Sequence, residues 1–197
     1  DGLDTLDFSA SSSGVQVDLS SGTLTDGVGF DDQFDSIEIV AGSEFSDTLV
    51  GGTGDDTLLG GSGDDTLVGG GADVIDGGDG ADVLELDGSV GVTAEGGEGT
   101  DTVQLVGSTN EASLSGVETV TGGFGDDTVT LTDASGSTVF LEGVETVTGS
   151  SGSDSIEITD DTSAVLDGGS GDDTLVGGSN ADTLIGGSGD DSLVGGS

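Results

Sequence analysis

The chain repeats a nine-residue sequence, most plainly as GGTGDDTLL at residues 51–59 and GGSGDDTLV at residues 60–68. Each copy joins a glycine-rich turn, with an aspartate at its sixth position, to a short apolar run. Glycine suits a turn that needs positive φ angles, whereas Asp-Thr-Leu-Val suits a very short strand. A fixed period of this kind indicates a solenoid, in which each coil contacts its neighbours and one core runs along the stack. We expect two nonapeptides to form one flattened coil.

The repeats predict one continuous domain over residues 1–197 with four internal blocks. The blocks are irregular N-terminal coils at 1–41, a first nonapeptide block at 42–85, long-period coils at 86–167 and a second nonapeptide block at 168–197. In the third block the repeats lengthen to 26, 27 and 19 residues. The first two of these close on the same Val-Glu-Thr-Val-Thr sequence, at 117–121 and 144–148.

One aliphatic residue in each repeat is expected to form the core. Side chains alternate between the two faces of a strand, so the eighth position of the nonapeptide points inward. The residues predicted to point inward are Leu49, Leu58, Leu67, Ile75, Leu84, Val103, Val129, Ile156, Leu175, Leu184 and Leu193. Such a core is one side chain thick, and 42 glycines raise the entropy cost of folding, so we expect bound ions to contribute.

The charge of the chain points to a cation. It has 41 acidic residues and no Lys, Arg or His, so its carboxylates have no side-chain cation as a partner. Either the chain is disordered or it binds cations from solution; the regular register of its apolar residues argues against disorder. Without His or Cys, zinc and copper are disfavoured, whereas Ca²⁺ prefers the carboxylates and carbonyls that are present.

Composition also excludes several kinds of partner and activity. A net charge of -41 excludes nucleic-acid binding. No apolar run is long enough to cross a membrane, so we expect no direct membrane insertion. His, Cys and Lys are all absent, which leaves no residue to activate a nucleophile, and we expect this segment not to be an enzyme.

The repeats resemble those of the RTX family, the haemolysin-type calcium-binding proteins, and the resemblance covers nearly the whole chain. It implies an all-β fold, a right-handed parallel β-roll or β-solenoid with stacked Gly-Asp turns. It also implies that several Ca²⁺ ions are held by turn carbonyls and by the sixth-position aspartates. Matched to this sequence, those metal ligands are Asp47, Asp56, Asp65, Asp73, Asp82, Asp101, Asp127, Asp154, Asp173, Asp182 and Asp191.

Elementary coordination chemistry agrees with this assignment. Ca²⁺ takes six to eight oxygens, and a glycine-rich turn exposes several carbonyls within reach of a short Asp side chain. Residues 18 apart lie on neighbouring turns of one edge, which pairs Asp47 with Asp65 and Asp173 with Asp191. The fifth-position acids are expected to point outward. These are Asp55, Asp64, Asp126, Asp172 and Asp190.

Individual sites depart from the pattern. A one-residue deletion precedes Asp73, Phe45 and Asn180 replace the fourth-position glycine, and Asp101 and Asp127 have no adjacent nonapeptide. We expect these sites to be incomplete or empty. The alternative for any single copy is ordinary Asp-Gly turn chemistry; several copies in phase with an aliphatic residue favour calcium.

The resemblance implies a secreted or surface-exposed bacterial protein. The leading hypothesis is a structural module that folds and stiffens on Ca²⁺ ligation, as a segment or subunit of a stalk, adhesin or filament. The alternative is the repeat region of a secreted RTX enzyme or toxin whose active domain lies outside this chain. Ice or glycan binding is less favoured, because the chain has only two Asn residues, Asn110 and Asn180, and six Phe as its only aromatics.

Two features raise the question of self-association. The ninth position is also apolar, at Val50, Leu59, Val68, Val176, Ile185 and Val194, which suggests either lateral association or a simple preference for β-branched strand ends. In addition, joining the last two residues, Gly196 and Ser197, to the first seven, Asp1–Asp7, gives a complete nonapeptide, GSDGLDTLD. This suggests tandem units or head-to-tail stacking, in which Asp4 would become a ligand; a truncated segment explains it equally well.

Overall fold

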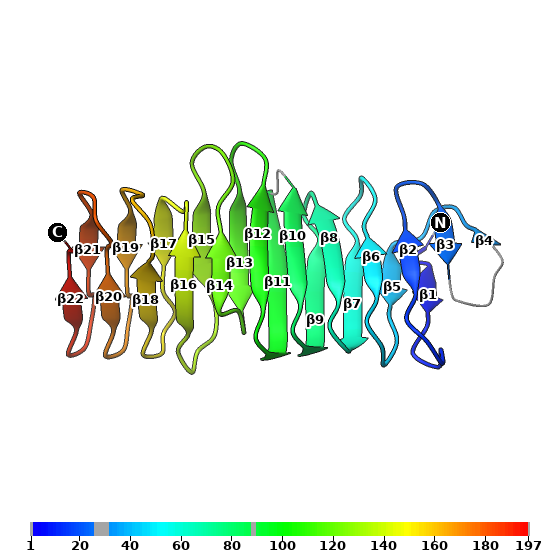
Figure 1. Ribbon diagram of the computed structural model, residues 1–197, viewed down its shortest axis with the longest axis horizontal. Helices are drawn as coiled ribbons and strands as arrows, with labels where there is room; N and C mark the ends of the chain where they lie inside the picture. Colours follow the sequence, from blue (N-terminus) through cyan, green and yellow to red (C-terminus); the bar gives the residue numbers. More distant parts are fainter. Residues whose placement is uncertain (1, 26–31, 88–89, 197) are drawn as a thin grey trace.

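The computed structural model describes residues 2–25, 32–87 and 90–196, and its secondary structure is entirely β. Two sheets lie face to face and run the length of an elongated molecule (Figure 1). The ten-stranded sheet contains, in spatial order, β1 (Thr5–Asp7), β5 (Ile39–Ala41), β7 (Thr57–Ser62), β9 (Val74–Gly80), β11 (Val90–Gly99), β13 (Glu111–Ser115), β15 (Thr128–Leu131), β17 (Thr146–Thr148), β19 (Val165–Asp167) and β21 (Thr183–Ile185).

The second sheet has twelve strands. In spatial order they are β22 (Ser192–Val194), β20 (Thr174–Val176), β18 (Ser155–Ile158), β16 (Thr138–Glu142), β14 (Thr119–Thr121), β12 (Thr102–Val106), β10 (Val83–Asp87), β8 (Thr66–Gly70), β6 (Thr48–Val50), β2 (Gln16–Asp18), β3 (Thr23–Thr25) and β4 (Asp32–Gln33). From β5 onward successive strands alternate between the sheets, and each pairs in parallel with the strand one coil away. The fold is therefore the predicted all-β solenoid of stacked coils.

Each coil contains one strand of each sheet, so two nonapeptides form one coil, as predicted. Equivalent residues of neighbouring coils lie 17 to 19 residues apart in most of the stack, and 20 or 21 apart where β11 pairs with β13 and β14 pairs with β16. The repeats of 26 and 27 residues each span about one and a half coils, whereas the 19-residue repeat spans one coil. As a result the glycine-rich turn moves from one edge of the solenoid to the other between Asp101 and Asp127, and returns at Asp154.

The core follows strand alternation. Nine of the eleven residues predicted to point inward are at most 1% exposed, from Leu49 to Leu175. The other two lie in the last coils, where no further coil covers them: Leu184 is partly buried and Leu193 is 46% exposed.

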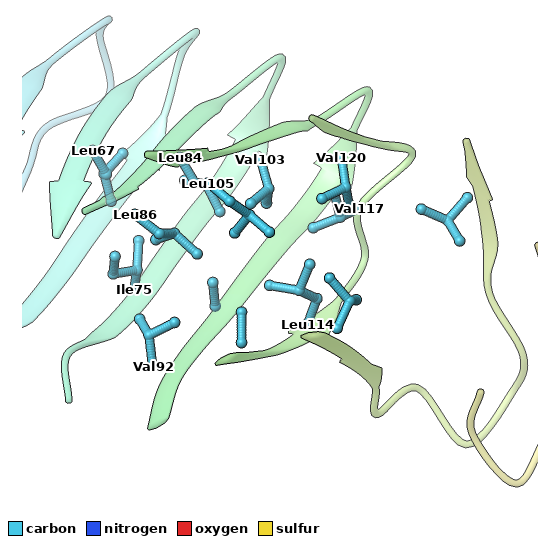
Figure 2. Packing of buried hydrophobic residues seen from close by; sticks show 14 of the residues in the cluster. Leu67, Ile75, Leu84, Leu86, Val92, Val103, Leu105, Leu114, Val117 and Val120 are labelled. Atoms are coloured by element: carbon cyan, nitrogen blue, oxygen red, sulfur yellow. The ribbon is translucent and has the colours of Figure 1, made fainter. Parts of the chain in front are cut away.

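The middle coils have a wider core than the nonapeptide coils. Here a strand contributes two inward side chains, such as Leu84 with Leu86 in β10 and Val103 with Leu105 in β12 (Figure 2). Val117, at the turn before β14, and Leu114, in β13, point into the same apolar layer (Figure 2). Burial of these additional aliphatic groups adds hydrophobic stabilisation to this segment.

The N-terminal end differs from the rest of the stack. There β2 pairs in parallel with β6 but antiparallel with β3, and β3 pairs antiparallel with β4. Leu24 of β3 is 7% exposed and extends the core past the first coil. The predicted junction of Ser197 with Asp1 lies outside the described residues.

Apolar side chains are exposed near the two nonapeptide blocks and also in the middle coils, where Phe140 of β16 and Val165 of β19 are 44% and 42% exposed. The ninth-position residues Val50 and Val68 stack in register on β6 and β8, but Glu85 follows them on β10. At the other end Ile185 and Val194 are 45% and 50% exposed. The apolar ninth positions therefore do not form a continuous stripe along the faces. In the described part of the chain no helix is long and apolar enough to cross a membrane.

Candidate metal centre

The predicted metal ligands form two columns, one along each edge of the solenoid, where each turn enters a strand. The first edge precedes the twelve-stranded sheet and holds Asp47, Asp65, Asp82, Asp101, Asp154, Asp173 and Asp191. The second edge precedes the ten-stranded sheet and holds Asp56, Asp73, Asp127 and Asp182. Nine of these eleven side chains are at most 5% exposed, the exceptions being Asp182 and Asp191 in the last coils, which are partly buried.

At ten of the eleven aspartates, all except Asp56, one carboxylate oxygen accepts a backbone N–H from the neighbouring coil. The backbone N–H of Asp47 donates to Oδ1 of Asp65 at 2.7 Å, and the N–H of Asp65 donates to Oδ1 of Asp82 at 2.8 Å. The predicted neighbours Asp173 and Asp191 are joined in the same way at 3.0 Å. Because one end of each bond is a carboxylate, these bonds are stronger than those between neutral groups. The columns are therefore also ladders that hold the coils in register.

The fifth-position acids lie outside these ladders. Asp55, Asp64, Asp126, Asp172 and Asp190 are all exposed, as predicted. They add negative potential around each edge.

The second carboxylate oxygen, Oδ2, is satisfied by the aspartate's own turn at five positions. There the N–H of the second turn residue donates to Oδ2 over 2.5 to 2.9 Å. The donor and acceptor pairs are Ser43 with Asp47, Gly52 with Asp56, Gly70 with Asp73, Gly123 with Asp127, and Ser150 with Asp154. We call these the closed turns.

At five other positions Oδ2 is buried and accepts no hydrogen bond from the described residues. These aspartates are Asp65, Asp82, Asp101, Asp173 and Asp182. In each of their turns the second residue is a glycine with positive φ, between 82° and 112°: Gly61, Gly78, Gly97, Gly169 and Gly178. None of the second residues of the closed turns has a positive φ. We call these five the open turns.

The first glycine of the turn makes room for the carboxylate. A Cβ placed on Gly60 would lie 2.4 Å from Oδ2 of Asp65 and 2.4 Å from the carbonyl oxygen of Gly77. Gly77 and Gly168 stand in the same relation to Asp82 and Asp173. Because the first residue of the turn is glycine, the space that a Cβ would fill is occupied by the carboxylate and by a turn carbonyl oxygen.

Sequence reasoning missed three glutamates that continue the columns. Oε2 of Glu118 accepts the N–H of Asp101 at 2.7 Å, and Oε2 of Glu145 accepts the N–H of Asp127 at 2.8 Å. Oε2 of Glu38 accepts a hydrogen bond from the N–H of Asp4 at 3.0 Å. The available signal was the Val-Glu-Thr-Val-Thr sequence, in which Glu precedes the strand as Asp does in Asp-Thr-Leu-Val.

The positions expected to be defective have different outcomes. Asp73 keeps its place in the second column despite the deletion, with Oδ1 on the N–H of Asp56. Asp101 has an aspartate of a complete nonapeptide beside it on its edge, because the N–H of Asp82 donates to Oδ1 of Asp101 at 2.8 Å. Asp127 lies between Asn110 and Glu145, so no aspartate adjoins it in the column.

Burial without a cation raises the pKa of four aspartates in the columns, three in open turns and one, Asp73, in a closed turn. Desolvation raises the pKa of Asp65 to about 7, and the neighbouring charges of Asp47, Asp82 and Asp64 add to the shift against the opposing hydrogen bond from Asp47. Desolvation likewise raises the pKa values of Asp82 and Asp101. An ionised carboxylate in these places needs a positive partner.

The arrangement fits calcium. Among the described residues no three acidic side chains gather as a ready-made metal cluster, so a site here has to use backbone oxygens as well. Calcium accepts such mixed sets of carboxylate and carbonyl oxygens. Each open turn offers a buried carboxylate oxygen without a hydrogen-bond donor, beside stacked turn backbone. The cation would neutralise buried charge that no side chain of this protein neutralises.

Comparison with known proteins agrees with the geometry. The family model described as the RTX calcium-binding nonapeptide repeat matches four segments, at residues 41–71, 68–89, 114–131 and 167–197, which together cover about half of the chain. No curated protein matches the chain significantly. RTX nonapeptide repeats bind Ca²⁺, with several ions distributed over the repeats. With its stacked parallel coils and aspartate columns, the chain belongs to the family of RTX calcium-binding nonapeptide repeat proteins.

Proposed function

We propose that this calcium-binding solenoid is an extracellular structural module, which folds and stiffens on ligation as a segment or subunit of a secreted bacterial stalk, adhesin or filament. The observation that carries the proposal is the set of five buried Oδ2 atoms without a donor, in a chain with no Lys, Arg or His. Membership of the RTX family, whose repeats are typical of secreted bacterial proteins, supports the extracellular setting.

The candidate ligands in this proposal are drawn from the eleven sixth-position aspartates, together with carbonyls of their turns. Bound calcium supplies positive charge and joins neighbouring coils. The aspartate ladders already set those coils in register, so each ion adds to contacts that extend along the whole edge.

Ligation would drive folding because the sites do not exist in the unfolded chain. A ligand that binds only the folded state stabilises it by about 2.7 kcal/mol per independent site at a hundred times its dissociation constant. Extracellular calcium modules work with dissociation constants near 10⁻⁴ to 10⁻³ M. The chain would thus remain unfolded at low cytoplasmic calcium and fold outside the cell.

A second candidate function is the calcium-binding repeat region of a secreted enzyme or toxin. The family match supports it as much as the first, and the lack of His, Cys and Lys means that any catalytic groups would lie outside this chain. A parent protein with a separate non-repetitive domain would favour this candidate, whereas hundreds of similar repeats would favour the stalk.

The test is a calcium titration of the chelator-treated chain, followed by far-UV circular dichroism and sedimentation. We expect a cooperative gain of β signal as calcium is added. Growth in size at the same calcium concentrations supports a filament that assembles head to tail or laterally, while folding without growth supports a passive module. Absence of any calcium response would refute the proposal.

A further inference from the structure

The eleven aspartates are alike in sequence, yet the structure divides most of them into the closed and open turns defined above. This division rests on two separate observations, the hydrogen bonding of Oδ2 and the backbone φ of the second turn residue, and the two agree at all ten positions. We propose that calcium enters the open turns and not the closed ones, whose own N–H groups take the place of the ion. The inference rests on the proposed function and specifies its sites.

The physical argument starts from the cost of a buried charge. In a closed turn such as that of Asp73, Oδ1 accepts the N–H of Asp56 and Oδ2 accepts the N–H of Gly70, both at 2.8 Å. Both oxygens are thus stabilised without an ion. In the open turn of Asp82, Oδ1 accepts the N–H of Asp65 at 2.8 Å, but Oδ2 has no donor. An ion at Asp73 would bind oxygens whose charge the N–H groups already stabilise and would gain little, whereas an ion at Asp82 would satisfy a buried oxygen that has no partner.

Open turns also stack directly on one another. The N–H of Gly63 donates to the carbonyl of Asp79 at 2.8 Å, and Gly78 and Gly97 pair in register. These bonds join the turns of Asp65, Asp82 and Asp101 into one row on the first edge. A second row on that edge begins at the turn of Asp173, where the N–H of Gly171 donates to the carbonyl of Ser188 at 2.9 Å. Carbonyl oxygens with one hydrogen bond keep a lone pair for a cation.

Each row on the first edge begins beside a turn closed by serine. Ser43 donates its N–H and its hydroxyl to Asp47, and Ser150 does the same for Asp154. Serine rarely adopts the positive φ that the open turn requires. On this edge, a turn that begins with Gly-Ser instead of Gly-Gly is therefore stable without calcium. Such a turn provides an ordered neighbour for the open turn in the next coil.

The sharpest test compares Asp82→Asn with Asp73→Asn in the full chain. The two aspartates are 1% and 0% exposed and make the same ladder bond, so they differ mainly in the partner of Oδ2. Bound calcium is counted by equilibrium dialysis at saturating concentration, and stability is measured by urea unfolding in the same buffer. We expect Asp82→Asn to reduce the number of bound ions. Asp73→Asn should keep the number of ions and lower the urea midpoint, because an amide N–H₂ cannot accept the N–H of Gly70.

A second pair of variants keeps the inference testable if one variant of the first pair fails to fold. Asp173→Asn and Asp154→Asn change an open and a closed turn that adjoin on the first edge. Only Asp173→Asn should lose calcium. Equal losses from both members of a pair, or a loss confined to the closed turn, would overturn this inference while leaving calcium-driven folding intact. If the unmodified chain bound no calcium, the proposed function itself would fail.

Discussion

The backbone N–H of Asp101 donates a hydrogen bond of 2.7 Å to Oε2 of Glu118, seventeen residues further along the chain. Asp101 is fully buried, and the glutamate approaches it from a tight Gly-Val-Glu turn in place of the six-residue glycine-rich turn. The longer side chain of Glu reaches the position that Asp occupies in the other coils. The aspartate column is thereby continued beyond the glycine-rich turn of Asp101.

Removal of this acceptor should destabilise the solenoid. Glu118→Ala leaves the N–H of Asp101 without its partner in a buried position, at a cost of about 1–3 kcal/mol. Urea unfolding in saturating calcium would measure the loss. Glu98→Ala, at an exposed position of the preceding turn, is the control and should change stability little. Equal effects of the two substitutions would contradict the assigned role of Glu118.

The first glycine of an open turn should not tolerate a methyl group. In Gly60→Ala the new Cβ would lie 2.4 Å from Oδ2 of Asp65, so we expect a loss of about 1–3 kcal/mol from overpacking together with weaker calcium binding. Gly195→Ala is the matched control, because nothing lies within 4 Å of its Cβ position. Thermal unfolding at fixed calcium separates the two; a harmless Gly60→Ala would show that the turn can open further.

Core position should decide the effect of leucine truncation. Leu58 is 0% exposed between neighbouring coils, so Leu58→Ala should cost about 2–5 kcal/mol. Leu193 occupies the same place in its repeat but is 46% exposed, so Leu193→Ala should cost much less. Urea midpoints in saturating calcium would check this difference. Similar losses would mean that the last coil is covered in solution, as in head-to-tail assembly.

Acidification should favour the fold when calcium is absent. The folded-state pKa of Asp65 is about 7, raised from an ordinary value of 3.8 by desolvation, so the folded chain retains a proton that the unfolded chain releases. Stability is therefore present at low pH and is lost as the pH rises from about 4 to 7. Asp73, Asp82 and Asp101 shift in the same direction.

The measurement is far-UV circular dichroism of the calcium-free chain between pH 5 and 8. The β signal should be greatest at the acidic end. Asp65→Asn, which cannot ionise, should flatten part of this dependence. A β signal that rose with pH would contradict the predicted linkage.

Several features could be predicted from the sequence because they depend on local chemistry. The period of the nonapeptide indicated stacked coils, and strand alternation identified Leu49, Leu67 and Leu175 as core residues. The 18-residue spacing also paired Asp47 with Asp65. These predictions needed only the two-residue period of a strand and the length of one coil.

The middle of the chain was less predictable because coil length is a tertiary property. The long repeats suggested long coils, whereas the structure has coils of 17 to 21 residues and moves the turns between the edges. Glu118 and Glu145 come into line with the aspartates only through this packing.

The sequence by itself determined the composition of the site, since a polyanion with regular Gly-Asp turns and no cationic side chain requires an external cation. Only the tertiary structure decided which carboxylates lack a partner. Asp73 and Asp82 occupy similar repeats, but the N–H of Gly70 reaches one and the positive φ of Gly78 leaves the other without a donor. Both Gly70 and Gly78 are glycines, which permit either backbone conformation, so the residue type left the choice open and the packed structure decided it.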